Sequence, residues 1–260
     1  MARVRLDSLL AERGLFDSRS RAAAAVLAGD VLLLPGRRRA DKPGQLVGSD
    51  VELEVTQPPP FVSRGGIKLV NALDALGLDV GGRMAMDVGA STGGFTDCLL
   101  QRGAGHVVAV DVAYGELHWR LREHPRVTVL ERVNARALEP AQLPYAPDLV
   151  VADVSFISLG KVLPAVLGCA AAAFDALVMV KPQFEVGRGR VGKGGVVGDP
   201  ALRREALLAV AGGCGAAVMG FAASGLPGPK GNRETFAWLA EPGRSGALED
   251  LAGAVAEVDA

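Results

Sequence analysis

Residues 84–95 read Met-Ala-Met-Asp-Val-Gly-Ala-Ser-Thr-Gly-Gly-Phe, and this stretch decides the fold that we expect. Its first part, Met84 to Val88, is a short apolar run typical of a buried strand. The glycines after it let the backbone turn sharply and approach a ligand closely. A helix is expected from Thr96 onward. The stretch therefore predicts a strand, a ligand-binding loop and a helix in direct succession.

The spacing within this loop distinguishes between patterns of nucleotide binding. The dinucleotide fingerprint Gly-x-Gly-x-x-Gly, started at Gly89, would need a glycine where Ser91 stands. An acid two residues before the first glycine, followed by small residues, is instead typical of class I methyltransferases, which bind S-adenosylmethionine. A glycine-rich turn that holds no ligand is the alternative. The cofactor-binding residues on the first interpretation are Asp87, Gly89, Ala90, Ser91, Thr92, Gly93, Gly94 and Phe95.

Apolar strand-like runs alternate with helical stretches along the chain. The runs are Met84 to Val88, Val107 to Val112, Val127 to Leu130, Leu149 to Val154, Ala176 to Val180 and Ala216 to Ala222. Such alternation predicts a parallel sheet with helices on both faces, an α/β, Rossmann-like domain. Ligands of such sheets bind at the carboxyl ends of the strands. There Asp111 could accept hydrogen bonds from ribose hydroxyls and Asn134 could line an adenine pocket, with a helix cap and a turn cap as the alternatives.

Four charged residues stand at the ends of apolar strands or beside glycine-rich turns: Lys68, Asp153, Lys181 and Glu234. Unpaired buried charge is costly, so these groups are expected to pair with one another. A lysine whose pKa is lowered by burial and by a second cation could accept the proton of a ribose 2′-hydroxyl or orient its lone pair. We therefore interpret the four as one catalytic set, and two ordinary salt bridges are the alternative.

The first 56 residues are expected to form a separate small α+β unit. Short helices are predicted at Leu6 to Leu10 and Arg19 to Ala28, the second ended by Gly29 and capped by Asp17 or Ser18. Residues 57–63 contain three consecutive prolines and are expected to be a stiff linker. The methyltransferase domain is predicted over 64–240. An acidic tail, 241–260, is expected to be a weakly packed helix or disordered.

Charge and cysteine content limit the class of protein. The net charge of −1 conceals two basic stretches, +3 over residues 1–70 and +5 over 181–233, which are compatible with a nucleic-acid partner. The three cysteines lie far apart, so no metal site or disulfide framework is expected and a cytoplasmic setting fits. Pro164 and Asp175 interrupt the apolar run Val162 to Val180, which predicts a helix and a buried strand instead of a membrane span.

Taken together, these motifs resemble the TlyA family of ribosomal RNA 2′-O-methyltransferases, historically called hemolysins. The resemblance extends from Arg5 to about Trp238. It is carried by Arg5 to Asp7, Ser18 to Ala22, Val62 to Leu69, Asp87 to Asp97, Val110 to Val112, Asp153 to Ser158, Lys181 to Glu185 and Gly231 to Glu234. Departures are modest: Pro35-Gly36 stands where the N-terminal module usually has Asn-Gly, and Ala113 replaces a common glycine.

The resemblance implies an N-terminal RNA-binding module of the ribosomal-protein S-four kind, followed by an FtsJ-type methyltransferase domain. It implies that Lys68, Asp153, Lys181 and Glu234 form a Lys-Asp-Lys-Glu catalytic tetrad. The implied reaction is methyl transfer from S-adenosylmethionine to a cytidine 2′-oxygen in large-subunit and, in some members, small-subunit ribosomal RNA. The partner is then ribosomal RNA or a ribosomal subunit, and a monomer is favoured. The candidates for RNA contact are Arg5, Arg19, Arg21, Arg64, Arg188, Arg190 and Lys193.

Three other functions are alternatives. A membrane-lytic protein would need an amphipathic or spanning segment, which the sequence does not convincingly offer. A non-catalytic ribosome-assembly protein would lack the cofactor and tetrad residues, which are all present. A base methyltransferase would need a catalytic cysteine or an Asn-Pro-Pro-Tyr type of motif after a strand, and we find neither, since Cys98 is expected in the core. We also expect the stretch Glu185 to Gly198 to be a mobile loop that closes over RNA, and Phe156 and Phe184 to pack in the core in preference to stacking on a base.

Overall fold

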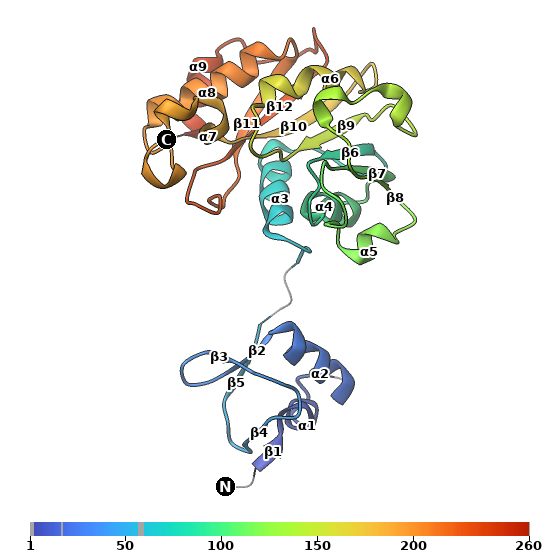
Figure 1. Ribbon diagram of the computed structural model, residues 1–260, viewed down its shortest axis with the longest axis vertical. Coiled ribbons are helices and arrows are strands. Elements are labelled where there is room, and N and C mark those ends of the chain that lie inside the picture. The colour runs from blue at the N-terminus through green and yellow to red at the C-terminus, as the bar shows by residue number, and fades with distance from the viewer. Residues whose placement is uncertain (1–2, 17, 57–59, 260) are drawn as a thin grey trace. The chain divides into compact units, whose positions relative to one another are not determined.

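The computed structural model describes residues 3–16, 18–56 and 60–259, and within them the side chain of Arg188 lies outside the description. The chain divides into two compact units, Met1–Pro60 and Phe61–Ala260 (Figure 1). Each unit has a hydrophobic core of its own. The catalytic motifs identified in the sequence all lie in the second unit.

The first unit is a small α+β structure. Helices α1 (Leu6–Glu12) and α2 (Arg19–Ala28) accompany two small sheets, one of β1 (Arg3–Arg5) and β4 (Leu46–Gly48), the other of β3 (Arg38–Arg39), β2 (Val31–Leu33) and β5 (Leu53–Val55). The Ser18 hydroxyl caps α2 by accepting from the Arg21 N–H, and Gly29 ends the helix at a φ of +83°. Asp17, the other predicted cap, lies outside the described residues. Leu6, Leu10 and Val31 are fully buried in the core.

The second unit is built on a seven-stranded sheet. Its spatial order is β11 (Ala217–Ala223), β12 (Thr235–Ala240), β10 (Asp175–Val180), β9 (Leu149–Ala152), β6 (Met84–Val88), β7 (His106–Val110) and β8 (Val127–Leu130). The pairs from β10 to β8 are parallel, and β12 runs antiparallel to both of its neighbours. The predicted strands are thus confirmed to within a few residues, but β12 was missed, although Thr235–Ala240 is an apolar run of the same kind.

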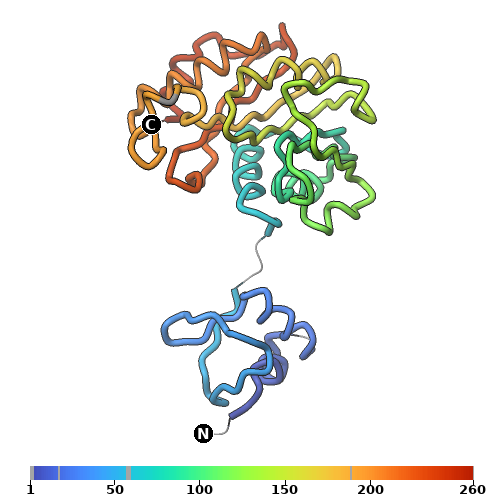
Figure 2. The backbone as a smooth tube through the Cα atoms, viewed as in Figure 1, coloured from blue at the N-terminus to red at the C-terminus, as the bar shows by residue number. Residues whose placement is uncertain are grey.

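Helices cover both faces of this sheet (Figure 2). The core on one face includes α3 (Arg64–Leu76), α4 (Gly94–Gln101) and α5 (Trp119–Arg122), and that on the other face includes α6 (Leu163–Gly168), α8 (Pro200–Gly213) and α9 (Leu251–Val258). Helix α9 differs from the weakly packed tail that we expected. Its Val255 is fully buried, and Asp259 after it pairs with Arg203 of α8.

The chain order creates a crevice at the carboxyl ends of β6 and β9. From β6 the chain proceeds to β7 and β8 on one side, and then returns to β9 on the other side of β6. Such a reversal is a topological switch point, where ligands of open α/β sheets bind. The apolar run Val162 to Val180 is divided between α6 and β10. Among the described residues, no helix combines the length and apolarity that crossing a bilayer requires.

Candidate active site

The glycine loop after β6 is packed so closely that its glycine positions 89, 93 and 94 have no room for a side chain. Gly89 and Gly93 have φ values of +83° and +96°, which favour glycine. A Cβ on Gly89 would lie 2.6 Å from the Asp153 carbonyl oxygen, and one on Gly93 would lie 2.8 Å from Leu117 Cδ1. A Cβ on Gly94 would collide with Ser63 Oγ. The loop is therefore held between β9, the segment before α5 and the start of α3.

Asp87 supports this loop from below. Its Oδ2 accepts hydrogen bonds from the Thr96 N–H at 2.9 Å and the Thr96 hydroxyl at 2.7 Å, while Oδ1 has no hydrogen-bond partner among the described residues. Complete burial raises the pKa of the Asp87 carboxyl to about 7. A buried carboxylate oxygen without a donor fits a cationic group bound nearby, such as the amino group of S-adenosylmethionine.

A cleft of about 430 Å³ joins the loop to the four charged residues. Its walls include Gly89 to Thr92, Gly94 and Phe95, together with Lys68, Asp153, Lys181 and Glu234. The structure thus brings the predicted tetrad and most of the predicted cofactor loop to one place. Asp87 itself is fully buried beneath the cleft.

The tetrad is organised as two ion pairs. Lys68 of α3 pairs with Glu234, which immediately precedes β12, and these side chains are 9 % and 1 % exposed. Lys181, at the end of β10, lies with its Nζ 2.5 Å from Asp153 Oδ1, and here the side chains are 11 % and 25 % exposed. Lys181 Nζ also donates to Ser155 Oγ at 2.8 Å. The ion pairs of the alternative interpretation exist, but both face the same cleft.

A second cavity, of about 500 Å³, adjoins the cleft. Ser155, Lys181 and Glu234 line both cavities, and Phe156 and Phe184 line the second. Phe156 is 92 % exposed with a φ of +64°, so the prediction that it packs in the core was wrong. Its ring centroid lies 5.4 Å from that of Phe184. The second cavity is therefore an aromatic-walled space that reaches the Lys181 ammonium.

The two remaining cofactor candidates occupy capping positions. Asp111 accepts from the Ser91 N–H at 2.7 Å and from the Ala113 N–H at 2.8 Å, so it fixes the cofactor loop to the chain after β7. Asn134 is exposed, accepts from the Arg136 N–H at 3.1 Å, and lines neither large cavity. The structure therefore shows Asn134 as a turn cap and does not bring it to the cleft. Asp111 borders a small cavity next to Ala90 and Ser91.

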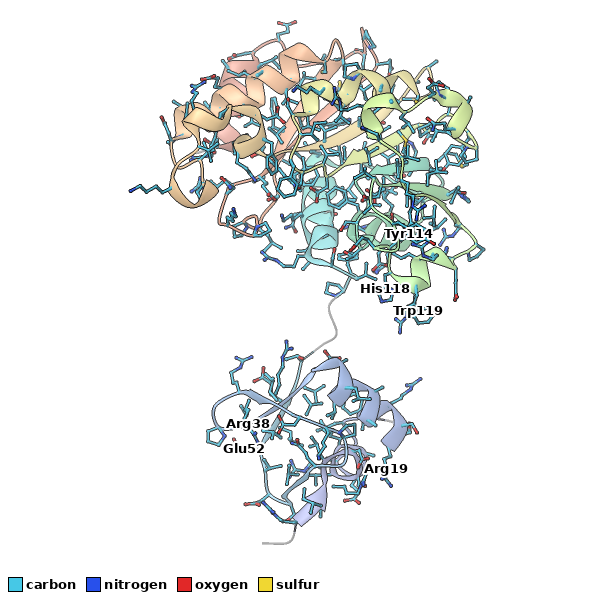
Figure 3. The ribbon with its side chains drawn as sticks, in the orientation of Figure 1. Arg19, Arg38, Glu52, Tyr114, His118 and Trp119 are labelled. Atoms are coloured by element: carbon cyan, nitrogen blue, oxygen red, sulfur yellow. The ribbon has the colours of Figure 1, made fainter. Side chains whose placement is uncertain are left out.

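In the first unit, a buried carboxylate organises two of the arginines predicted to contact RNA. Arg5 Nη2 lies 2.8 Å and Arg19 Nε 3.1 Å from Asp7 Oδ2. The Arg5 and Arg19 guanidinium groups hold the pKa of the Asp7 carboxyl well below its usual range. Both arginines remain about half exposed, and Arg21 on the same helix is exposed. Figure 3 labels Arg19 on this unit.

In the second unit, the residues predicted to contact RNA differ in their surroundings. Arg64 lines the cleft and donates to the Pro227 carbonyl at 3.1 Å. Arg190 forms a double ion pair with Glu205, whereas Lys193 is exposed. The side chain of Arg188 lies outside the description.

Asn232 anchors the stretch that we expected to be mobile. Its Oδ1 accepts from the Val197 N–H at 2.9 Å, and its Nδ2 donates to the Gly195 carbonyl at 2.8 Å. Glu185 performs a similar task for the segment after Asp153, since it accepts from the Ser158 hydroxyl at 2.6 Å and from the Leu159 N–H at 2.9 Å. Neither residue was assigned a role from sequence, nor was Ser155. Their presence inside the matched motifs was the only available signal.

A Rossmann-like sheet with a glycine loop after β6 and four charged groups beside it defines the molecule as a class I methyltransferase. The model of the FtsJ-like methyltransferase family matches residues 61–240. A relative from Mycobacterium tuberculosis, named 16S/23S rRNA (cytidine-2′-O)-methyltransferase TlyA, is 53 % identical over 91 % of this chain and 90 % of its own. Hemolysin A of Brachyspira hyodysenteriae is 37 % identical over 90 % of this chain and 98 % of its own.

A solved structure from Streptococcus thermophilus that carries the hemolysin name superposes with a TM-score of 0.73 at 36 % identity. It covers 99 % of this chain and 96 % of the other. The chain belongs to the FtsJ-like methyltransferase family and, within it, to the TlyA group. Its cofactor is S-adenosylmethionine, as the sequence predicted.

Proposed function

We propose that this enzyme methylates the 2′-oxygen of a cytidine in ribosomal RNA. The Mycobacterium tuberculosis relative is named for this activity on 16S and 23S ribosomal RNA. One observation carries the proposal: Lys181 and Glu234 line both the cleft beside the cofactor loop and the adjoining aromatic-walled cavity. A nucleotide with its base in that cavity would present its ribose hydroxyl to Lys181.

Bound S-adenosylmethionine supplies a methyl group that is already activated on a sulfonium. The chain therefore contributes mainly position and proton management. Lys181 Nζ is fixed by its ion pair with Asp153 and its hydrogen bond to Ser155, and at least one ammonium N–H stays available to hold the 2′-oxygen. A hydroxyl held in this way directs a lone pair at the methyl carbon.

The second ion pair, Lys68–Glu234, keeps the summed charge of the four groups at zero. Two ammonium groups and two carboxylates sum to zero charge, so the proton released from the hydroxyl enters a balanced site. Asp153 is the more exposed of the two carboxylates and provides the route for that proton to solvent. Lys68 and Glu234 are nearly sealed from water and fix the wall of the cleft.

We assign RNA capture to the first unit. The half-exposed arginines Arg5 and Arg19 are held by Asp7 in a fixed arrangement suited to phosphate groups. Arg64 adds a cation at the cleft. Since ribosomal RNA is the substrate, we place the enzyme in the cytoplasm. The tetrad and cofactor loop disfavour the non-catalytic alternative.

The test is methyl transfer by a Lys181→Met variant. Ribosomal RNA treated with enzyme and cofactor is mapped by reverse transcription at low dNTP, where a 2′-O-methyl group causes a stop. Loss of the oriented hydroxyl should lower the rate by roughly 10²–10⁴-fold without weakening cofactor binding. Arg102→Met, an exposed cation of the second unit that pairs with Asp74 and lines neither cavity, is the control. Methylation of a base, or a stop that persists in Lys181→Met, would show that the tetrad assignment is wrong.

A further inference from the structure

Beside the cofactor cleft, a group of large aromatic side chains is left in solvent. Trp119, the first residue of α5, is 61 % exposed, and Tyr114 in the preceding loop is 68 % exposed. Figure 3 shows Tyr114, His118 and Trp119 together on one side of the catalytic unit. With Arg120 and Arg132 these residues form what we call the aromatic rim. Exposed aromatic groups gathered in this way mark interaction surfaces.

An arginine guanidinium group lies over each of the two most exposed rings of the rim, those of Tyr114 and Trp119. The Arg132 guanidinium lies 4.4 Å from the Tyr114 ring centroid, and that of Arg120 lies 5.5 Å from the Trp119 centroid. The His118 ring is stacked beside Trp119 at 6.0 Å and 26°. Neither Arg120 nor Arg132 forms an ion pair with any residue that the structure describes, so their N–H groups are available to an anionic ligand. An aromatic face next to an arginine suits an unpaired nucleotide, whose base stacks while its phosphate meets the guanidinium.

The rim is fixed to the cofactor loop. The His118 N–H donates to the Thr92 carbonyl at 3.2 Å, and the side chains of Leu117 and Leu121 fill the space above Gly93. Ala90 and Ser91 line both the cofactor cleft and the small cavity that Leu117 borders. The rim therefore belongs to a segment that packs directly against the cofactor loop.

We propose that the aromatic rim is a second RNA-binding surface of the catalytic unit, on which unpaired bases near the methylated nucleotide stack. This proposal rests on the proposed function, since it assigns a further contact to the same RNA substrate. RNA is the partner that we propose, because the substrate of the adjoining site is RNA and because Arg120 and Arg132, which form no ion pair with a described residue, complement the charge of phosphate groups. The anchoring to Thr92 and Gly93 places this contact next to the bound cofactor.

The chain contains two tryptophans, so the fluorescence of Trp119 can be used to detect RNA binding at the rim once the other tryptophan is replaced. Trp238 is partly buried and donates to Asp175 Oδ1 at 2.9 Å. A Trp238→Phe variant, once its methyl-transfer rate is shown to match the wild type, leaves Trp119 as the only tryptophan. Titration with a single-stranded ribosomal RNA fragment that contains the methylated cytidine should quench its fluorescence, as stacking requires. A duplex of equal length and charge should quench it much less.

Substitutions at Trp119 separate stacking from mere bulk. Trp119→Leu should weaken RNA binding by about 5- to 100-fold, the range expected for one lost base–aromatic stack, while cofactor affinity is unchanged. Trp119→Phe should retain most of the affinity, and Tyr114→Leu should add a further loss to Trp119→Leu.

Three outcomes would overturn the proposal: Trp119→Leu binds RNA like the wild type, RNA leaves Trp119 fluorescence unchanged, or only an assembled ribosomal subunit quenches it and naked RNA does not. The last outcome would point to a ribosomal protein on the rim. Failure of the proposed function is distinguishable, because the wild type would then leave ribosomal RNA unmethylated whether or not Trp119 is quenched.

Discussion

Removal of Lys68 should destabilise the catalytic unit as well as inactivate it. A Lys68→Met variant keeps the approximate length of the side chain but leaves the Glu234 carboxylate, which is only 1 % exposed, without its cation. Breaking one partner of a buried pair costs about 3–5 kcal/mol. For a domain of this size each kcal/mol lowers the melting temperature by roughly 2–4 °C, so we expect a decrease of roughly 6–20 °C.

Lys181→Met is the matched comparison. Its partner Asp153 is 25 % exposed, so water can solvate the remaining carboxylate, and we expect a loss of roughly 1–2 kcal/mol. Both variants should be inactive, but only Lys68→Met should unfold at clearly lower urea concentration. The double variant Lys68→Met/Glu234→Leu removes both charges and should regain most of the stability while remaining inactive.

Urea unfolding followed by circular dichroism, with melting scans in parallel, measures these differences. The argument from burial is refuted if Lys68→Met and Lys181→Met are equally stable. It is also refuted if the double variant is no more stable than Lys68→Met. Methyl-transfer assays on the same samples separate loss of chemistry from loss of fold.

Three further predictions concern other parts of the molecule. Gly89→Ala should weaken cofactor binding more than Gly115→Ala. The two glycines have similar φ values, +83° and +79°, so the backbone strain is alike, but only the Cβ at Gly89 would collide with backbone atoms. Equal losses of cofactor affinity in calorimetry would contradict this reasoning. Burial raises the pKa of Asp87 to about 7, above its unfolded value near 4, so the folded state retains that proton longer. The unfolding free energy should therefore fall from about pH 4 to pH 7, a slope that Asp87→Asn should lack. Asp7→Asn should weaken RNA binding several-fold at constant salt, since the arginines that Asp7 holds are released; unchanged affinity would show that their positioning is unimportant.

The local pattern was sufficient for the main elements of the catalytic unit. The strand at Met84–Val88 and the loop after it were predictable because a buried parallel strand requires an apolar run and a tight turn requires glycine. The strand Thr235–Ala240 was missed although it has the same apolar character, and its antiparallel direction depends on pairing with Asp175–Val180 and Ala217–Ala223, which the local pattern does not encode. A weakly packed helix was one of two expectations for the acidic tail, but the firm packing of α9 was not predicted, since the sequence gives no sign that Arg203 pairs with Asp259.

The roles of individual polar residues were less predictable. A cap and a ligand contact use the same carboxylate or amide, so Asn134 could be assigned to either from sequence, and the structure shows a cap. The exposure of Phe156 depends on a backbone φ of +64°, which no sequence pattern announced. Ser155 was inconspicuous until the structure placed it 2.8 Å from Lys181.

The sequence by itself determined the α/β class, the cofactor loop and the identity of the four charged groups, because each depends on residue types that are close along the chain or that belong at strand ends. Only the tertiary structure decided how these groups pair, which of them water reaches, and that Lys181 and Glu234 join two cavities. Pairing and solvation depend on distances between segments up to 166 residues apart in the sequence, and those distances are fixed by the order of the strands in the sheet.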